Sequence, residues 1–284
     1  LTGNGAAELI YALCRAVPAG RALLTAPSFQ EYENALEAAD HSCEFLYLKE
    51  ENDFILPLQE LLLKITEETS LVFLCNPGNP TGTVTGKAEL VRLAERCEET
   101  KTFLCVDECF LPFLPGEPAL SMKGETVRFP HLAVLRAFTK VYGMPGLRLG
   151  YLMTGNRELA GRLKEKLPPW NVSLPAQLAG AAALKAEGYL EKTRELIRGE
   201  KEKLVSLLLE TVADRVYPGS ANFLFFHGRE GLKEALLDRK ILIRDCSNFK
   251  GLSRGYYRIC IRTQEENERL KEILYSLAGK EAGK

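Results

Sequence analysis

A lysine followed by an arginine one short loop later is the first feature of this sequence that could do chemistry. Lys140 lies in RAFTKVYGMPGLRLGY (136–151), directly after the apolar run 132–135, and Arg148 comes eight residues beyond it. A lysine that apolar surroundings keep uncharged can attack a carbonyl and hold an aldehyde cofactor as a Schiff base. An arginine nearby can bind that cofactor's phosphate through two parallel hydrogen bonds. A single Lys–Arg pair of this kind is more often structural, so further residues are needed to indicate a cofactor site.

Two more polar groups follow apolar runs that are typical of buried strands. One run leads into NPGNPTG (76–82), whose prolines and glycines predict a sharp turn that presents the amide of Asn79. The other run, 103–106, leads into Asp107, which taken alone would be expected only to cap a helix. Because ligands bind at the carboxyl ends of parallel strands, we expect Asn79, Asp107 and Lys140 to converge in one crevice.

Helical and apolar patterns alternate along the chain, which favours βα units around a mostly parallel sheet. The expected helices are 6–17, 30–39, 56–66, 86–100 and 265–277, and the expected strands are 21–25, 44–47, 71–75, 103–107, 132–135, 221–226, 241–244 and 257–262. A helical pattern also runs from about 175 to 210, and Gly188 is expected to divide it. We therefore expect an α/β fold with a large domain at 1–185 and a smaller C-terminal α/β domain at 186–284.

With their order along the chain, these motifs resemble those of fold-type-I pyridoxal-phosphate enzymes, the aminotransferases of class I/II. The resemblance runs from Gly3 to about Leu277. Within the class the sequence is similar to two groups, the histidinol-phosphate aminotransferases and the threonine-phosphate decarboxylase of cobalamin biosynthesis. The resemblance implies a large domain with a mostly parallel central sheet and a smaller C-terminal domain.

The resemblance also implies a cofactor, pyridoxal 5'-phosphate, and a role for each matching residue. Lys140 would bind the cofactor aldehyde, and Asp107 would pair with the pyridine nitrogen and keep it protonated. Of the other cofactor contacts, Asn79 would bond the ring 3-oxygen, Phe29 would stack on the ring, and Gly5, Ala6, Ala7, Thr139 and Arg148 would hold the phosphate.

Some residues depart from the aminotransferase pattern. Phe110 stands where aminotransferases commonly carry a tyrosine whose hydroxyl bonds the ring oxygen, and phenylalanine there is more like the decarboxylase. Ala137 stands where the family has a hydroxyl that contacts the phosphate. Trp170, in LPPWNVSLPAQ (167–177), again resembles the decarboxylase and is expected in a pocket wall.

Arginines in the last third of the chain are the candidates for substrate binding. Arg258 and Arg262 are four residues apart on an expected strand, so both should point to one face. The resemblance assigns Arg258 to the substrate carboxylate and Arg244 to the substrate phosphate, because a planar guanidinium can pair with either anion through two hydrogen bonds. Arg262 is expected to be either a third anion ligand or a surface residue.

Composition excludes several other classes of function. The 284 residues are 46% hydrophobic and 26% charged with a net charge of −1, as in ordinary globular proteins, and no basic tract suggests nucleic acid. No apolar run is long enough to span a membrane. The eight cysteines show no C-x-x-C spacing, which favours reduced thiols and a cytoplasmic location, and three scattered histidines argue against a metal site.

The expected activity is the pyridoxal-phosphate-dependent decarboxylation of L-threonine O-3-phosphate to 1-aminopropan-2-ol phosphate. The alternative is an aminotransferase that acts on histidinol phosphate or a related phosphorylated amine. A third hypothesis is a non-catalytic protein that uses this fold to bind a ligand. Because the chain starts at Leu1, immediately before GNGAAEL (3–9), we also expect that an N-terminal arm is missing, and the resemblance implies a homodimer.

Overall fold

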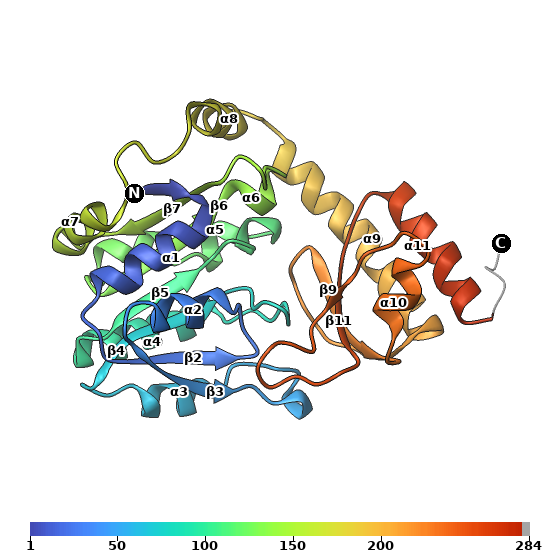
Figure 1. Cartoon of the computed structure of the whole chain (residues 1–284), viewed down its shortest axis with the longest axis horizontal. Helices are drawn as coiled ribbons and strands as arrows, with labels where there is room; N and C mark the ends of the chain where they lie inside the picture. Colours follow the sequence, from blue (N-terminus) through green and yellow to red (C-terminus); the bar gives the residue numbers. More distant parts are fainter. Residues whose placement is uncertain (280–284) are drawn as a thin grey trace.

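Two β-sheets organise residues 1–279, the part of the chain that the computed structural model describes (Figure 1). The first has seven strands in the order β1-β7-β6-β5-β4-β2-β3, and the second has four in the order β10-β11-β9-β8. This confirms the expected α/β class. The last five residues of the expected C-terminal domain, 280–284, lie outside the described residues.

The seven-stranded sheet is mostly parallel. Its strands are β1 (Thr2–Asn4), β2 (Arg21–Ala26), β3 (Ser42–Tyr47), β4 (Thr69–Cys75), β5 (Phe103–Asp107), β6 (Leu132–Ala137) and β7 (Leu149–Thr154). Strands β3, β2, β4, β5 and β6 are parallel neighbours, whereas β7 runs antiparallel between β6 and β1. The associated helices are α1 (Gly5–Ala16), α2 (Glu31–Glu37), α3 (Leu58–Lys64), α4 (Lys87–Thr100), α5 (Glu117–Leu120), α6 (Phe138–Val141), α7 (Arg157–Lys166) and α8 (Leu174–Leu184).

Alternation along the central strands gives this sheet two buried faces. Leu24 and Phe73 pack in one apolar cluster with residues of α1 and α2. Their neighbours Leu23 and Val72 pack in another cluster with residues of α3 and α4. Because successive side chains of a strand point to opposite faces, a continuous apolar run fills both layers at once.

The second sheet forms from the last third of the chain. Its elements are α9 (Tyr189–Thr211), β8 (Ala213–Val216), β9 (Phe223–Gly228), α10 (Leu232–Leu237), β10 (Arg244–Asp245), β11 (Tyr256–Cys260) and α11 (Gln264–Leu277). Gly188 precedes α9 with φ of 70°, so the expected division of the helical segment at this residue is correct. The strand expected at 241–244 is wrong, because only Arg244 and Asp245 pair with β11.

An aromatic contact joins the two sheets. Phe54 follows β3 in the chain, yet its ring packs edge-on against Tyr217 and Phe225, with centroids 5.1 and 5.5 Å away. Glu50 accepts hydrogen bonds from the hydroxyl groups of Tyr256, at 2.6 Å, and Tyr217. These contacts hold the smaller sheet beside the carboxyl ends of β4, β5 and β6. No helix within residues 1–279 combines the length and the apolar character needed to cross a membrane.

Candidate active site

A cavity of about 380 Å³ lies where the ends of β4, β5 and β6 face the smaller sheet. Ten of the residues singled out from the sequence as ligand contacts line it: Ala6, Ala7, Phe29, Asn79, Asp107, Thr139, Lys140, Arg148, Arg244 and Arg258. Phe110 and Ala137, the two departures from the aminotransferase pattern, line it as well. Its volume is in the range of sites that bind small ligands.

Asp107 is the buried carboxylate of the cavity. It ends β5 and is 5% exposed. The Tyr32 hydroxyl donates a hydrogen bond to its Oδ2 at 2.6 Å, and the backbone N–H of Cys109 donates to its Oδ1 at 2.9 Å. The Tyr32 ring is itself held by stacking on Phe73, with centroids 4.8 Å apart. Burial, and then the nearby Asp107, raise the pKa of Tyr32 well above its usual range, so Tyr32 remains a donor to this carboxylate.

Lys140 lies in the single-turn helix α6, directly after β6. Burial lowers the pKa of its amine below the ordinary lysine value, and the nearby Arg258 and Arg148 lower it further. A lower pKa means that more of the amine is neutral at a given pH. The neutral amine is the form that attacks a carbonyl, so the surroundings of Lys140 favour a nucleophile.

The N-terminus of α1 and Arg148 form one end of the cavity. Gly5 opens the 12-residue helix α1 with φ of +77°, and a Cβ atom there would lie 2.6 Å from Nη2 of Arg148. Glycine therefore allows the guanidinium to lie against the first turn of the helix. Arg148 itself has φ of 55°, a conformation that non-glycine residues seldom adopt. A helix N-terminus combined with a guanidinium suits a phosphate.

Arg258 and Arg244 bring positive charge to the opposite side. They are register partners in β11 and β10. Arg258 donates a hydrogen bond to the Asn79 carboxamide oxygen, which leaves the Asn79 nitrogen to donate to a ligand. Arg244 donates to Asn248 Oδ1 at 2.9 Å, and neither arginine has a carboxylate partner within residues 1–279. With Arg148 the cavity holds three guanidinium groups against one carboxylate, Asp107, which favours an anionic ligand.

Two residues expected at the substrate do not line this cavity. Strand β11 ends at Cys260, so Arg262 does not share a strand face with Arg258; its exposed guanidinium pairs with Glu266 of α11. Of the two roles expected for Arg262, an anion ligand or a surface residue, the structure supports the surface residue. Trp170 is fully exposed, so the structure does not support a pocket wall at this residue. The neighbouring Asn171 side chain donates a hydrogen bond to the carbonyl oxygen of Thr2 at 3.0 Å, whereas the Trp170 ring lies in solvent.

Reasoning from the sequence missed several cavity residues. They are Tyr32, Cys75, Cys109 and Phe249. The only signal for Tyr32 was its place in APSFQEY, three residues after Phe29. Phe249 comes from the loop between β10 and β11, the two strands that carry Arg244 and Arg258. Within residues 1–279 no group of His, Cys, Asp and Glu is arranged to hold a metal ion.

Comparisons with known proteins identify relatives of this fold. The family model "Aminotransferase class I and II" matches residues 1–274. The threonine-phosphate decarboxylase of Salmonella typhimurium is 37% identical over 96% of this chain and 75% of its own length. The crystal structure of the histidinol-phosphate aminotransferase from Clostridium acetobutylicum superposes with a TM-score of 0.92 at 31% identity, over 98% of this chain and 83% of its own. The L-threonine-O-3-phosphate decarboxylase from Porphyromonas gingivalis gives 0.84 at 26% identity, over 99% and 83%.

Proposed function

The chain belongs to the aminotransferase class I and II family, and on that basis we propose that it decarboxylates L-threonine O-3-phosphate to 1-aminopropan-2-ol phosphate. It is an enzyme whose cofactor is pyridoxal 5'-phosphate, and the non-catalytic hypothesis is therefore set aside. The observation that carries the choice of substrate is the pair Arg244 and Arg258, which line the cavity with no carboxylate partner within residues 1–279. Two guanidinium groups suit a substrate with two anions, a carboxylate and a phosphate. Histidinol phosphate carries only the phosphate. Its amino acceptor 2-oxoglutarate carries two carboxylates, so the arginine pair distinguishes the two reactions only by their amino substrates.

The residues of the cavity fit the cofactor, and we propose the following contacts. Asp107 would bind the pyridine nitrogen and hold its proton, and the Asn79 nitrogen would donate to the ring 3-oxygen. Phe29 would cover the ring, and Lys140 would bind the aldehyde carbon. The phosphate would lie against Gly5, Ala6, Ala7, Thr139 and Arg148, where the Arg148 guanidinium lies close to Gly5 in the first turn of α1.

The bound cofactor supplies an electron sink for the charge that builds up on the substrate carbon. The chain's own residues decide which bond breaks. Arg258 and Arg244 would fix the two anionic ends of the substrate, so that the bond to the carboxylate stands perpendicular to the ring plane. When CO2 leaves, its bonding electron pair stays on the carbon. Lys140, which would take up a proton from the ammonium group of the incoming substrate, would donate that proton to the carbon as general acid. The apolar side chains of Phe110 and Phe249 would limit the access of water.

Transamination is the second candidate function, because the same cofactor contacts serve both reactions. The close superposition on the Clostridium acetobutylicum histidinol-phosphate aminotransferase favours it. Phe110 speaks against it, since a phenyl ring cannot replace the hydrogen bond of the tyrosine common in aminotransferases. The two candidates differ in the atoms lost, CO2 in one and an amino group in the other.

A direct assay separates these candidates. The purified protein with cofactor is incubated with L-threonine O-3-phosphate, and the released CO2 is measured. In parallel it receives histidinol phosphate and 2-oxoglutarate, and glutamate is measured. We expect CO2 and little glutamate. Glutamate without CO2 would reject the decarboxylase and leave the aminotransferase as the function.

The reaction of the apoprotein with the cofactor should depend on pH in a way set by Lys140. Its pKa lies below the ordinary 10.5, so the neutral, reactive amine is fully formed at a lower pH than in free lysine. We expect the rate of covalent binding to rise with pH and to level off at a lower pH than for a free lysine amine, as followed by stopped-flow absorbance. A free lysine derivative, measured alongside, should still gain rate at that pH. A plateau no lower than that of the free amine would contradict the prediction.

We further propose that residues 1–185 form the larger, cofactor-binding domain, that 186–284 form the smaller one, and that two chains associate as a homodimer. Exposed apolar side chains support an interface near α8. They are Trp170, which is fully exposed, and Leu174 and Leu178, which are 66% and 63% exposed. Light scattering on the purified protein tests the dimer, which a monomeric mass at working concentration would exclude.

A further inference from the structure

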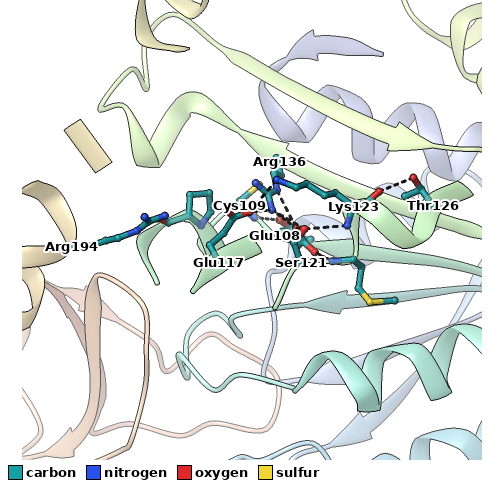
Figure 2. A network of polar contacts seen from close by, with 11 residues as sticks. Glu108, Cys109, Glu117, Ser121, Lys123, Thr126, Arg136 and Arg194 are labelled. Carbon is teal, nitrogen blue, oxygen red and sulfur yellow. Dashed lines mark hydrogen bonds and ion pairs between the residues drawn. The ribbon is translucent and has the colours of Figure 1, made fainter. Parts of the chain in front are cut away.

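A buried cluster of charged residues lies next to the cavity without lining it (Figure 2). Glu108 directly follows Asp107 and is 0% exposed, and Arg136 of β6 is 7% exposed. Glu117, the first residue of α5, completes the cluster and is 8% exposed. In Figure 2 the three side chains point toward one another, with Ser121 beside Glu108. We call Glu108, Glu117 and Arg136 the charged cluster.

Hydrogen bonds and ion pairs link the members of the charged cluster to one another and to Ser121. Arg136 donates to Oε2 of Glu108 from Nε at 3.0 Å and from Nη2 at 2.7 Å. Its Nη2 also donates to Glu117 and to the Ser121 hydroxyl oxygen, the latter at 2.9 Å. Glu108 accepts two further bonds, from the Ser121 hydroxyl and from the backbone N–H of Met122, both at 2.7 Å. Such a network allows the two glutamates and the arginine little freedom of orientation.

Backbone hydrogen bonds connect the charged cluster to Asp107 in the cavity. The Glu108 N–H donates to the carbonyl oxygen of Leu135 in β6 at 2.8 Å, so Glu108 is fixed both by its side chain and by its backbone. The next residue, Cys109, provides the N–H that bonds Asp107 at 2.9 Å. The orientation of the Asp107 carboxylate therefore depends on where Glu108 is held.

The same cluster fixes the strand end that leads to Lys140. Arg136 lies four residues before Lys140, and β6 ends at Ala137, which lines the cavity. The guanidinium spans the two strands, because Arg136 belongs to β6 and Glu108 follows β5. One ion pair thus ties the strand that ends in Asp107 to the strand that leads into Lys140.

We propose that the charged cluster consists of positioning residues, which hold Asp107 and Lys140 in the relative geometry that the cofactor requires. The proposal rests on the cofactor roles proposed for those two residues, and not on which reaction follows. Stability alone gives a poor account of the cluster, because burying charges costs about as much as their pairing returns. A role in holding the geometry of the site explains the cluster better, because displacements of about 1 Å at a catalytic group can lower rates about a hundredfold.

The variant Arg136→Lys tests this proposal. Lysine keeps the positive charge but cannot present the planar fork that bonds Glu108 twice. We expect kcat to fall about tenfold or more with KM nearly unchanged. We also expect the pH midpoint of the absorbance of the lysine-bound cofactor to move, because Asp107 and Lys140 no longer face the cofactor as before. Loss of stability alone would move neither the pH midpoint nor the ratio of kcat to KM at a temperature where the protein is folded.

Arg21→Lys is the matched control. Arg21 begins β2 and bonds Glu44 at 2.5 Å and Thr69 at 2.8 Å, away from the cavity. The Arg21→Lys variant should lower the melting temperature and leave the pH midpoint of the cofactor absorbance unchanged. If Arg136→Lys does not fold, Ser121→Ala takes its place, because Ser121 bonds both Glu108 and Arg136.

An unaltered pH midpoint and kcat in the folded Arg136→Lys protein, or in Ser121→Ala where that replaces it, would overturn the positioning role. Failure of the underlying cofactor assignment looks different. In that case the unaltered protein itself would show no absorbance from a lysine-bound cofactor, and the proposal would fall together with the role of Lys140.

Discussion

Replacing Lys140 by alanine is expected to abolish the visible absorbance of the covalently bound cofactor and to lower turnover by about 10^4-fold, the upper range for loss of one general acid–base group. The reason is that this amine would both bind the aldehyde and return a proton to the substrate carbon. Arg148 and Thr139 would remain, so the variant should still bind the cofactor without a covalent bond. Absorbance spectra and initial rates measure the two effects.

Lys201→Ala is the matched control for this variant. Burial lowers the pKa of Lys201 too, but its amine donates to the carbonyl oxygen of Gly219 and does not line the cavity. The control therefore asks whether any partly buried lysine gives the absorbance. We expect its spectrum to match that of the unaltered protein. A Lys140→Ala protein that kept the covalent absorbance would reject the assignment of the nucleophile.

The central strands of the fold were predictable from their continuous apolar sequences. Strands buried on both faces need continuous apolar runs, and β4, β5 and β6 have them, as at Leu71–Cys75. The antiparallel strands β1 and β7 were missed. Strand β1 is the three residues Thr2–Asn4, and its pairing with β7 depends on residues about 150 positions away. No local pattern reports such a long-range contact.

The errors in the smaller sheet have a similar origin. Residues 241–243 are apolar, but the chain there is not paired, and only Arg244 and Asp245 reach β11. An apolar run does not by itself determine hydrogen bonding to a neighbouring strand, and here Leu242 is 76% exposed. For the same reason the strand expected at 257–262 ends early, at Cys260, and Arg262 turns to Glu266.

The chemistry of the cavity was more predictable than its walls. Lys140, Asp107 and Asn79 each follow a strand, and parallel strands bring their ends together whatever the details of the loops. Tyr32 and Cys109 required the folded geometry, because their contacts with Asp107 depend on the side-chain packing of α2 and on the turn after β5. The charged cluster also escaped notice, since Glu108, Glu117 and Arg136 share no motif.

The second large effect is expected from Asp107→Asn. Asparagine keeps the shape of the side chain but carries no negative charge, so it cannot hold a proton on the pyridine nitrogen. Without that proton the ring withdraws electrons poorly, and turnover should fall on the order of 10^2–10^3-fold, as when other preorganised electrostatic groups are removed. Lys140 is intact in this variant, so its covalent absorbance should persist, with a changed dependence on pH.

Tyr32→Phe provides a graded comparison, because it removes only the 2.6 Å hydrogen bond to Oδ2 of Asp107. The carboxylate then keeps its charge and its bond from the Cys109 N–H, so we expect a loss of activity well below that of Asp107→Asn. Asp53→Asn, which breaks an ion pair with Arg215 outside the cavity, should leave turnover unchanged. Equal turnover in the unaltered protein and in Asp107→Asn would mean that this carboxylate does not face the pyridine nitrogen, and the proposed orientation of the cofactor would have to be reversed.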